Sequence, residues 1–129
     1  MFNPFKGRKA PEEPKAGTAD DENPAEAEAV MTIQMKCQIG TVFARSMYAS
    51  EEDFKAQSAR YKQIRDQCIA LADQIKDEFY RGAAVHQITN MCVVAKDMTV
   101  ARALLLSIRD GSIREKIFET APALRGTQA

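Results

Sequence analysis

The sequence predicts an all-α fold, an antiparallel bundle of three long helices plus a short C-terminal helix. The first reason is that apolar residues recur at helical spacing over most of the chain after residue 23. The second is composition, because 45% hydrophobic residues with six Met and no Trp favour an adaptable helical core over a sheet sandwich. A chain of 129 residues has room for one such domain, which we expect to cover residues 24–121.

Residues 1–23 are predicted to be a disordered tail. Residues 10–23 read APEEPKAGTADDEN and contain no aliphatic side chain larger than Ala, so they cannot bury enough apolar surface to offset the entropy of ordering. Ahead of them, MFNPFKGRK places Phe2 and Phe5 beside the basic Lys6 and Arg8. A plain disordered terminus is the simpler interpretation, and the alternative is that these four residues are candidates for binding a partner protein or an anionic membrane surface.

The first helix is expected at about residues 24–48, with Asn23 as its cap and Pro24 at its first position. Apolar residues at a 3,4 spacing form one face: Val30, Ile33, Cys37, Gly40, Ala44 and Met47. A neighbouring face carries four more apolar residues, which we predict to bind a partner: Met31, Met35, Ile39 and Val42. A helix that is apolar on two sides is expected to have more than one neighbour.

The second helix is expected at about residues 50–81. Ser50 with Asp53 three residues later is close to a capping box. Apolar residues then recur every seventh position, in a pattern typical of a coiled-coil seam: Phe54, Tyr61, Cys68 and Ile75. Gly82, after a basic last turn, predicts the end of this helix.

The third helix is expected at about residues 83–110, and the sequence leaves open whether it bends near Asp97. In the stretch LLLSIRDGSIREKIF, residues 104–118, we predict that Gly111 ends this helix and that Ser112 caps a short helix at about 112–120. The alternative is a β-hairpin around Asp110 and Gly111, because Asp-Gly is a strong hairpin signal. Residues 122–129 are expected to be disordered.

No catalytic, cofactor or metal site is predicted. The chain lacks the usual phosphate-loop, dinucleotide, hydrolase and zinc-protease motifs. Its one histidine, His86, has no identified partner, and Cys92 six positions later lies on a different side of an ideal helix. We therefore expect a protein that is not an enzyme and has no small-molecule substrate.

The net charge and the cysteine spacing indicate which class of partner and which cellular compartment to expect. A net charge of +0 argues against nucleic-acid binding, which usually shows as a concentrated basic face. Three widely spaced cysteines give neither a disulfide framework nor a zinc pattern and indicate a reducing, cytoplasmic location. No apolar run is long enough to span a bilayer, and no secretory signal is found.

Two short pieces of the sequence resemble the start of ESCRT-III subunits. These pieces are Met1 to Glu13, ahead of a helical hairpin, and VVAKDMTVARA at Val93 to Ala103. The resemblance implies a terminal segment that touches membranes and hairpins that polymerise. The chain departs from that family, whose hairpin core is strongly basic, because Met31 to Tyr48 adds a weakly charged helix, so no residue role is carried over.

The function that the sequence favours is a non-catalytic protein–protein interaction module. Such a module would be an adaptor, a chaperone or an assembly subunit that binds a protein partner or a second copy of itself. The two apolar faces of the first helix, the heptad seam and the Phe2 and Phe5 segment support this hypothesis. The alternative is a helical protein associated with a membrane surface, through residues 1–9, or with nucleic acid.

Overall fold

The computed structural model describes residues 24–126, and these residues form helices without any strand. The prediction of an all-α fold is therefore confirmed, and the hairpin alternative for residues 104–118 is wrong. The elements, in chain order, are α2 (Pro24–Ser46), α3 (Glu51–Asp73), α4 (Glu78–Val94), α5 (Met98–Leu106), α6 (Gly111–Thr120) and α7 (Ala123–Gly126). The tail predicted at residues 1–23 lies outside the described residues.

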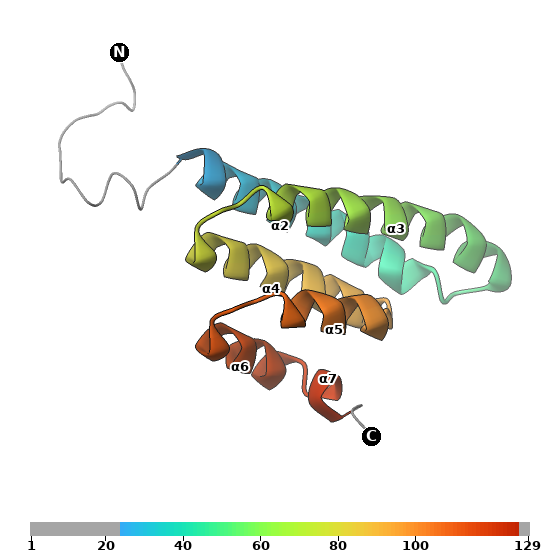
Figure 1. Ribbon diagram of the computed structural model, residues 1–129. Helices are drawn as coiled ribbons and strands as arrows, with labels where there is room; N and C mark the ends of the chain where they lie inside the picture. Colours follow the sequence, from blue (N-terminus) through green and yellow to red (C-terminus); the bar gives the residue numbers. More distant parts are fainter. Residues whose placement is uncertain (1–23, 127–129) are drawn as a thin grey trace, which may run out of the picture.

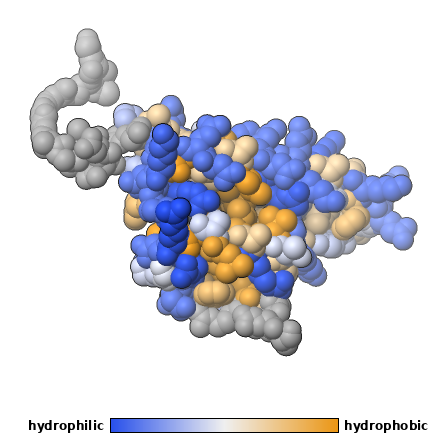
Figure 2. All heavy atoms as spheres, in the orientation of Figure 1, coloured by the Kyte–Doolittle hydropathy of each residue, from blue (hydrophilic) through white to orange (hydrophobic). Residues whose placement is uncertain are grey.

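The helices are stacked in successive layers (Figure 1). Helices α2 and α3 lie side by side, α4 packs against both, and α5 packs on α4. The two short helices α6 and α7 follow beyond α5. Figure 2 shows that hydrophilic residues cover most of α3 on this side, while hydrophobic residues gather along the α3–α4 boundary and over α5.

Helix α2 buries the face that the 3,4 spacing predicted. Ile33, Cys37, Gly40, Ala44 and Met47 are all buried. Most of these side chains are small, so α2 can lie close to both α3 and α4. Gly40 is the tightest position: a Cβ there would overlap with the Met91 sulfur and lie 3.1 Å from Ile64 Cγ2.

Helix α3 begins as predicted and ends earlier than predicted. The Ser50 hydroxyl accepts a hydrogen bond from the Asp53 N–H at 3.0 Å, so Ser50 caps the helix. The helix then ends at Asp73, not near residue 81. The backbone N–H groups of the turn that follows form hydrogen bonds with a side chain of α2 instead of continuing the helix. The Glu26 carboxylate of α2 accepts from the N–H groups of Lys76 and Asp77, at 2.7 and 3.2 Å.

Gly82 lies inside α4 and does not end a helix, so this prediction is wrong. Asp77 starts α4, since its carboxylate accepts from the Tyr80 N–H at 3.0 Å. Gly82 is buried where α6 crosses α4, and a Cβ there would lie 2.8 Å from Ile113 Cδ1. The glycine therefore permits a close helix contact.

The predicted third helix is broken at residues 95–97, which answers the question about Asp97. Lys96 has a φ of 61°, a left-handed conformation that ends α4. The Asp97 carboxylate accepts from the Tyr61 hydroxyl at 2.7 Å and from the Arg65 guanidinium at 2.9 Å. The Tyr48 hydroxyl donates to the Ala95 carbonyl. Side chains from outside α4 and α5 thus hold the turn in place.

The stretch LLLSIRDGSIREKIF is helix, break and helix, but the capping residues differ from the prediction. Helix α5 ends at Leu106, before Gly111, and Gly111 is instead the first residue of α6. Asp110 caps α6, because its carboxylate accepts from both the N–H and the hydroxyl of Ser112, at 2.9 and 2.7 Å. No described glycine has a positive φ, so Gly111 does not act as a left-handed helix stop.

The chain beyond residue 121 was expected to be disordered, and this is wrong for residues 123–126. These four residues form α7, and Leu124 is buried in the common core. Burial of the Leu124 side chain stabilises this short helix against the core. Residues 127–129 lie outside the described residues.

Candidate partner-binding site

The four apolar residues predicted to bind a partner share one exposed side of α2. Their exposed fractions are 62% for Met31, 63% for Met35, 54% for Ile39 and 57% for Val42. The spacing of four, four and three residues aligns them along the helix axis over about two to three turns. We call these four residues the outer face of α2. Large aliphatic side chains exposed as one continuous stripe typically mark an interaction surface.

The outer face carries a charge only beyond its ends. Glu28 lies before Met31, Arg45 lies after Val42, and both are exposed. Lys36 is the one charged residue between them in the sequence, and its ammonium points to α3, where it donates to the Gln67 side chain at 3.0 Å. The stripe is therefore neutral in the middle, acidic at its start and basic at its end.

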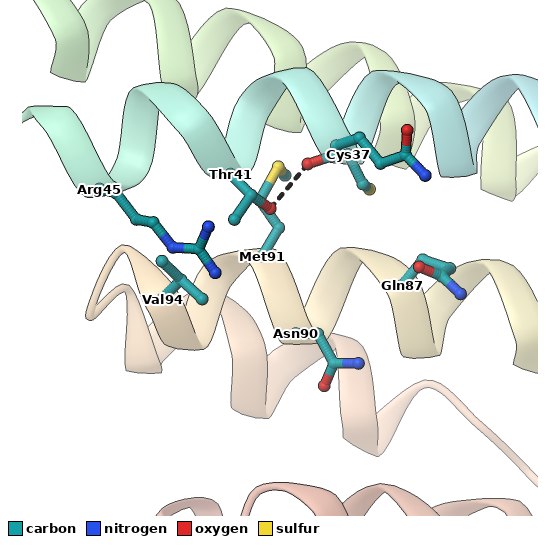
Figure 3. Close-up of a pocket in the computed structure, with 8 residues that line it drawn as sticks. Cys37, Thr41, Arg45, Gln87, Asn90, Met91 and Val94 are labelled. Carbon is teal, nitrogen blue, oxygen red and sulfur yellow. Dashed lines mark hydrogen bonds between the residues drawn. The ribbon is translucent and has the colours of Figure 1, made fainter.

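A shallow groove lies between α2 and α4 (Figure 3), and its lining residues Gln38 and Thr41 adjoin Ile39 and Val42 of the outer face in the sequence. Its volume is about 210 Å³. Gln38, Thr41 and Arg45 contribute from α2, and Figure 3 shows Arg45 reaching from α2 toward Val94 on α4. The remaining lining residues are Cys37, Gln87, Asn90 and Met91. Amide and guanidinium groups thus stand beside an apolar stripe, an arrangement that offers hydrogen bonds around an apolar contact.

Two of the three cysteines, Cys37 and Cys92, are not poised to react as nucleophiles. The Cys37 and Cys68 sulfurs lie 3.9 Å apart between α2 and α3, and both residues are buried. The hydrogen bond to Cys68 and burial raise the pKa of the Cys37 thiol, and burial raises the pKa of Cys92 to about 11. At neutral pH these two thiols are protonated, and a protonated thiol is a weak nucleophile.

The structure leaves the other predicted binding residues untested and adds features that the sequence did not reveal. Phe2, Phe5, Lys6 and Arg8 lie outside the described residues. The exposed aromatic Phe79, at 72%, was missed, because the predicted helix ran through it. Its only signal in the sequence was a large apolar residue among charged neighbours, in DEFYR at residues 77–81.

Within residues 24–126 the structure shows neither a metal site nor a membrane-spanning helix. No group of three or more His, Cys, Asp or Glu side chains is placed to hold a metal ion there. No helix in the same range combines the length and the apolar character needed to cross a bilayer. Comparison with known proteins finds no family, curated protein or solved structure that matches the chain. The resemblance to ESCRT-III subunits therefore stays a prediction.

Proposed function

We propose that this chain is a non-catalytic protein–protein interaction module, an assembly subunit that pairs with a second copy of itself through the outer face of α2. The observation that supports this proposal is the stripe of Met31, Met35, Ile39 and Val42, more than half exposed at each position. Covering such a stripe removes apolar surface from water, which favours association. The two methionines adapt their shape to a facing surface.

The charge pattern supports an antiparallel pairing of the two copies. Glu28 and Arg45 lie at opposite ends of the stripe. When two α2 helices cross head to tail, Glu28 of each copy comes opposite Arg45 of the other, and Met31 comes opposite Val42. A parallel pairing would instead place like charges together, which is unfavourable. The macrodipoles of the helices also favour the antiparallel arrangement.

The same charge pattern favours a protein partner over a membrane surface. Helices that lie on anionic membranes carry several Lys or Arg residues beside their apolar face. The outer face of α2 has one acidic and one basic residue at its ends, so it offers an anionic bilayer no net electrostatic attraction. A second copy with the same pattern offers two complementary contacts.

The bundle beneath the stripe supports the role of a rigid platform. We propose that α2, α3 and α4 form an antiparallel three-helix bundle. Contacts at three levels favour this arrangement of α2 and α3: the Glu26 carboxylate accepts from the Lys76 N–H, the Cys37 and Cys68 sulfurs meet, and the Tyr48 ring lies 6.0 Å from the tilted Phe54 ring. Held in this way, the outer face is ordered before a partner binds, which lowers the entropic cost of association.

The direct test is the mass of the full chain in solution, measured by light scattering over a range of concentrations. We expect wild-type chain to shift from monomer to dimer as its concentration rises. Ile39→Asp should remain monomeric, because it places a charge in the centre of the stripe. The control is Leu106→Asp, at an 80% exposed apolar residue on α5, which should dimerise like wild type. A wild-type chain that stays monomeric near millimolar concentration would contradict the proposal.

A charge exchange tests the orientation of the two copies. Glu28→Arg and Arg45→Glu should each weaken dimerisation by about fivefold, since two exposed ion pairs worth about 0.5 kcal/mol each are lost. The double variant restores both pairs in reversed order and should recover most of the affinity. Equal weakening in the double variant would exclude the antiparallel arrangement. Salt-dependent capture by anionic vesicles that Ile39→Asp abolishes would instead point to the membrane alternative.

A further inference from the structure

A second groove lies where α4 and α6 begin, far from the outer face of α2 along the sequence. Its volume is about 530 Å³. Phe79 and Ile113 are its apolar lining, and Phe79 is 72% exposed. The polar lining residues are Asp77, Glu78, Asp110, Ser112 and Lys116. An exposed phenylalanine beside an open groove leaves apolar surface that a second aromatic side chain could cover.

The groove is acidic, with three carboxylates against the single ammonium of Lys116. Asp77 and Asp110 cap α4 and α6, and each accepts backbone hydrogen bonds from its own helix. The hydrogen bonds from Ser112 lower the pKa of Asp110, so this carboxylate stays ionised at neutral pH. Because the caps occupy both helix starts, the dipoles that would attract an anion already face a negative charge. The groove therefore favours a cationic, apolar ligand.

The start of the described chain lies next to this groove. Glu26, in the first turn of α2, accepts hydrogen bonds from the N–H groups of Lys76 and Asp77, and Asp77 lines the groove. Figure 1 shows the starts of α2, α4 and α6 at the same end of the molecule. Residues 1–23 join the chain at this end.

The sequence of the first nine residues complements the groove. MFNPFKGRK contains two phenylalanines and three basic side chains, with no acidic residue. Fourteen residues, 10–23, separate this segment from Pro24. At full extension they span at most about 50 Å, which exceeds the distance needed to reach a groove beside residue 26.

We propose that residues 1–9 of the same chain dock in the groove of Asp77, Glu78, Phe79, Asp110 and Ile113. Phe2 and Phe5 contact Phe79 and Ile113, while Lys6, Arg8 and Lys9 face the three carboxylates. Covalent attachment makes this docking intramolecular, with an effective concentration on the order of millimolar, so a weak contact suffices. The outer face of α2 is a poorer site for the segment, because it has no net negative charge.

Nuclear magnetic resonance of the full-length ¹⁵N-labelled chain tests the docking. Phe79→Ala should shift the amide resonances of residues 2–9 and lower their heteronuclear NOE values, because the segment is released. Leu106→Ala is the matched control, since it removes an equally exposed apolar side chain on α5 and should leave residues 2–9 unchanged. Glu78→Lys should act like Phe79→Ala. If residues 2–9 respond identically to Phe79→Ala and to Leu106→Ala, the proposal is overturned.

Carbodiimide cross-linking identifies the chain to which the segment binds. Mixing ¹⁴N- and ¹⁵N-labelled chains allows mass spectrometry to separate links within one chain from links between two. We expect Lys6 or Lys9 to be linked to Asp77, Glu78 or Asp110 within one chain, and Phe2→Ala with Phe5→Ala to lower this yield by about fivefold, or roughly 1 kcal/mol. Links found only between chains, and lost on dilution, would exclude docking within the chain.

The docking of residues 1–9 can be tested independently of the dimer proposed above. Ile39→Asp should leave the Lys6 and Lys9 cross-links unchanged, and Phe79→Ala should leave the concentration dependence of the mass unchanged. If one variant abolished both the cross-links and the concentration dependence of the mass, the groove at Phe79 and the outer face of α2 would not be separate surfaces. That outcome would overturn the assignment of the segment to this groove.

Discussion

The two apolar faces of α2 have the same helical spacing and opposite environments. The inner face lies buried against α3 and α4, and the outer face is exposed along its whole length. The two faces differ in the volume of their side chains. Between Ile33 and Met47 the inner face consists of Cys37, Gly40 and Ala44, whereas the outer face consists of methionine, isoleucine and valine.

This difference teaches how to distinguish a core face from an exposed face of a helix when both are apolar. A helix that packs against two neighbours within one chain needs small residues where the axes approach, as at Gly40. A face that is free in the single chain has no such restriction and can carry large, flexible side chains. Side-chain volume along a helix face is therefore informative where periodicity alone is not.

The largest expected effect comes from truncating the same residue type on each face. Ile33→Ala removes a fully buried side chain and should lower the free energy of unfolding by about 3 kcal/mol. Ile39→Ala, six residues later on the outer face, should lower it by less than about 1 kcal/mol. Urea denaturation at a concentration where the chain is monomeric measures both. Equal destabilisation by the two variants would show that the outer face is also packed.

A smaller effect is expected from adding volume to the inner face. Gly40→Val should destabilise the fold by about 2 kcal/mol, because the new side chain meets Met91 and Ile64. The matched glycine is Gly111, where the nearest atom to a new Cβ is an Arg114 nitrogen at 3.6 Å. Gly111→Ala should change stability by no more than about 0.5 kcal/mol. Thermal unfolding followed by circular dichroism compares the two, and a stable Gly40→Val variant would contradict the close packing.

The smallest effect concerns pH and a position on neither face of α2. Burial, with a smaller contribution from Lys116, lowers the pKa of His86 below its ordinary 6.5. The unfolded chain therefore binds the proton more readily, so the stability from neutral His86 is complete above about pH 6.5 and is lost as pH falls through the lower, folded pKa. His86→Gln should flatten the dependence of unfolding free energy on pH in this window.

Self-association, measured as the mass of the chain in solution, provides the control for the pH experiment. His86 lies near the Thr120 hydroxyl, at 3.2 Å, and away from the outer face of α2. His86→Gln should therefore leave self-association unchanged. A pH dependence that persists in the variant would assign the titration to another group.

Much of the fold followed from local patterns in the sequence. Periodicity identified the helices and the inner face of α2, and Ser50 was recognised as a cap because its partner is three residues away. The breaks at residues 74–77 and 95–97 could not be predicted in this way. They depend on Glu26, Tyr61 and Arg65, which lie 32 or more residues from the groups that they hold.

Of the two candidate sites, one could be predicted from local sequence patterns and the other could not. The outer face of α2 was predicted because all four residues lie on one helix, where the spacing alone brings them together. The groove at Phe79 was not, because it exists only when the start of α6 lies beside the start of α4. Ile113 is brought there by the buried Gly82, whose role the sequence pattern had assigned to a helix end.

The hydrogen bonds from Tyr61 and Arg65 to Asp97 affect which part of the molecule unfolds locally first. Tyr61 and Arg65 tie the corner between α4 and α5 to α3, while α6 and α7 pack largely on α5 and on each other. Because α5 packs on α4, whereas α6 and α7 pack mainly on α5 and on each other, we expect the amides of α6 and α7 to exchange with deuterium before those of α2 to α5. Local opening of α6 and α7 would release the end of the fold while the proposed dimer surface on α2 stays intact.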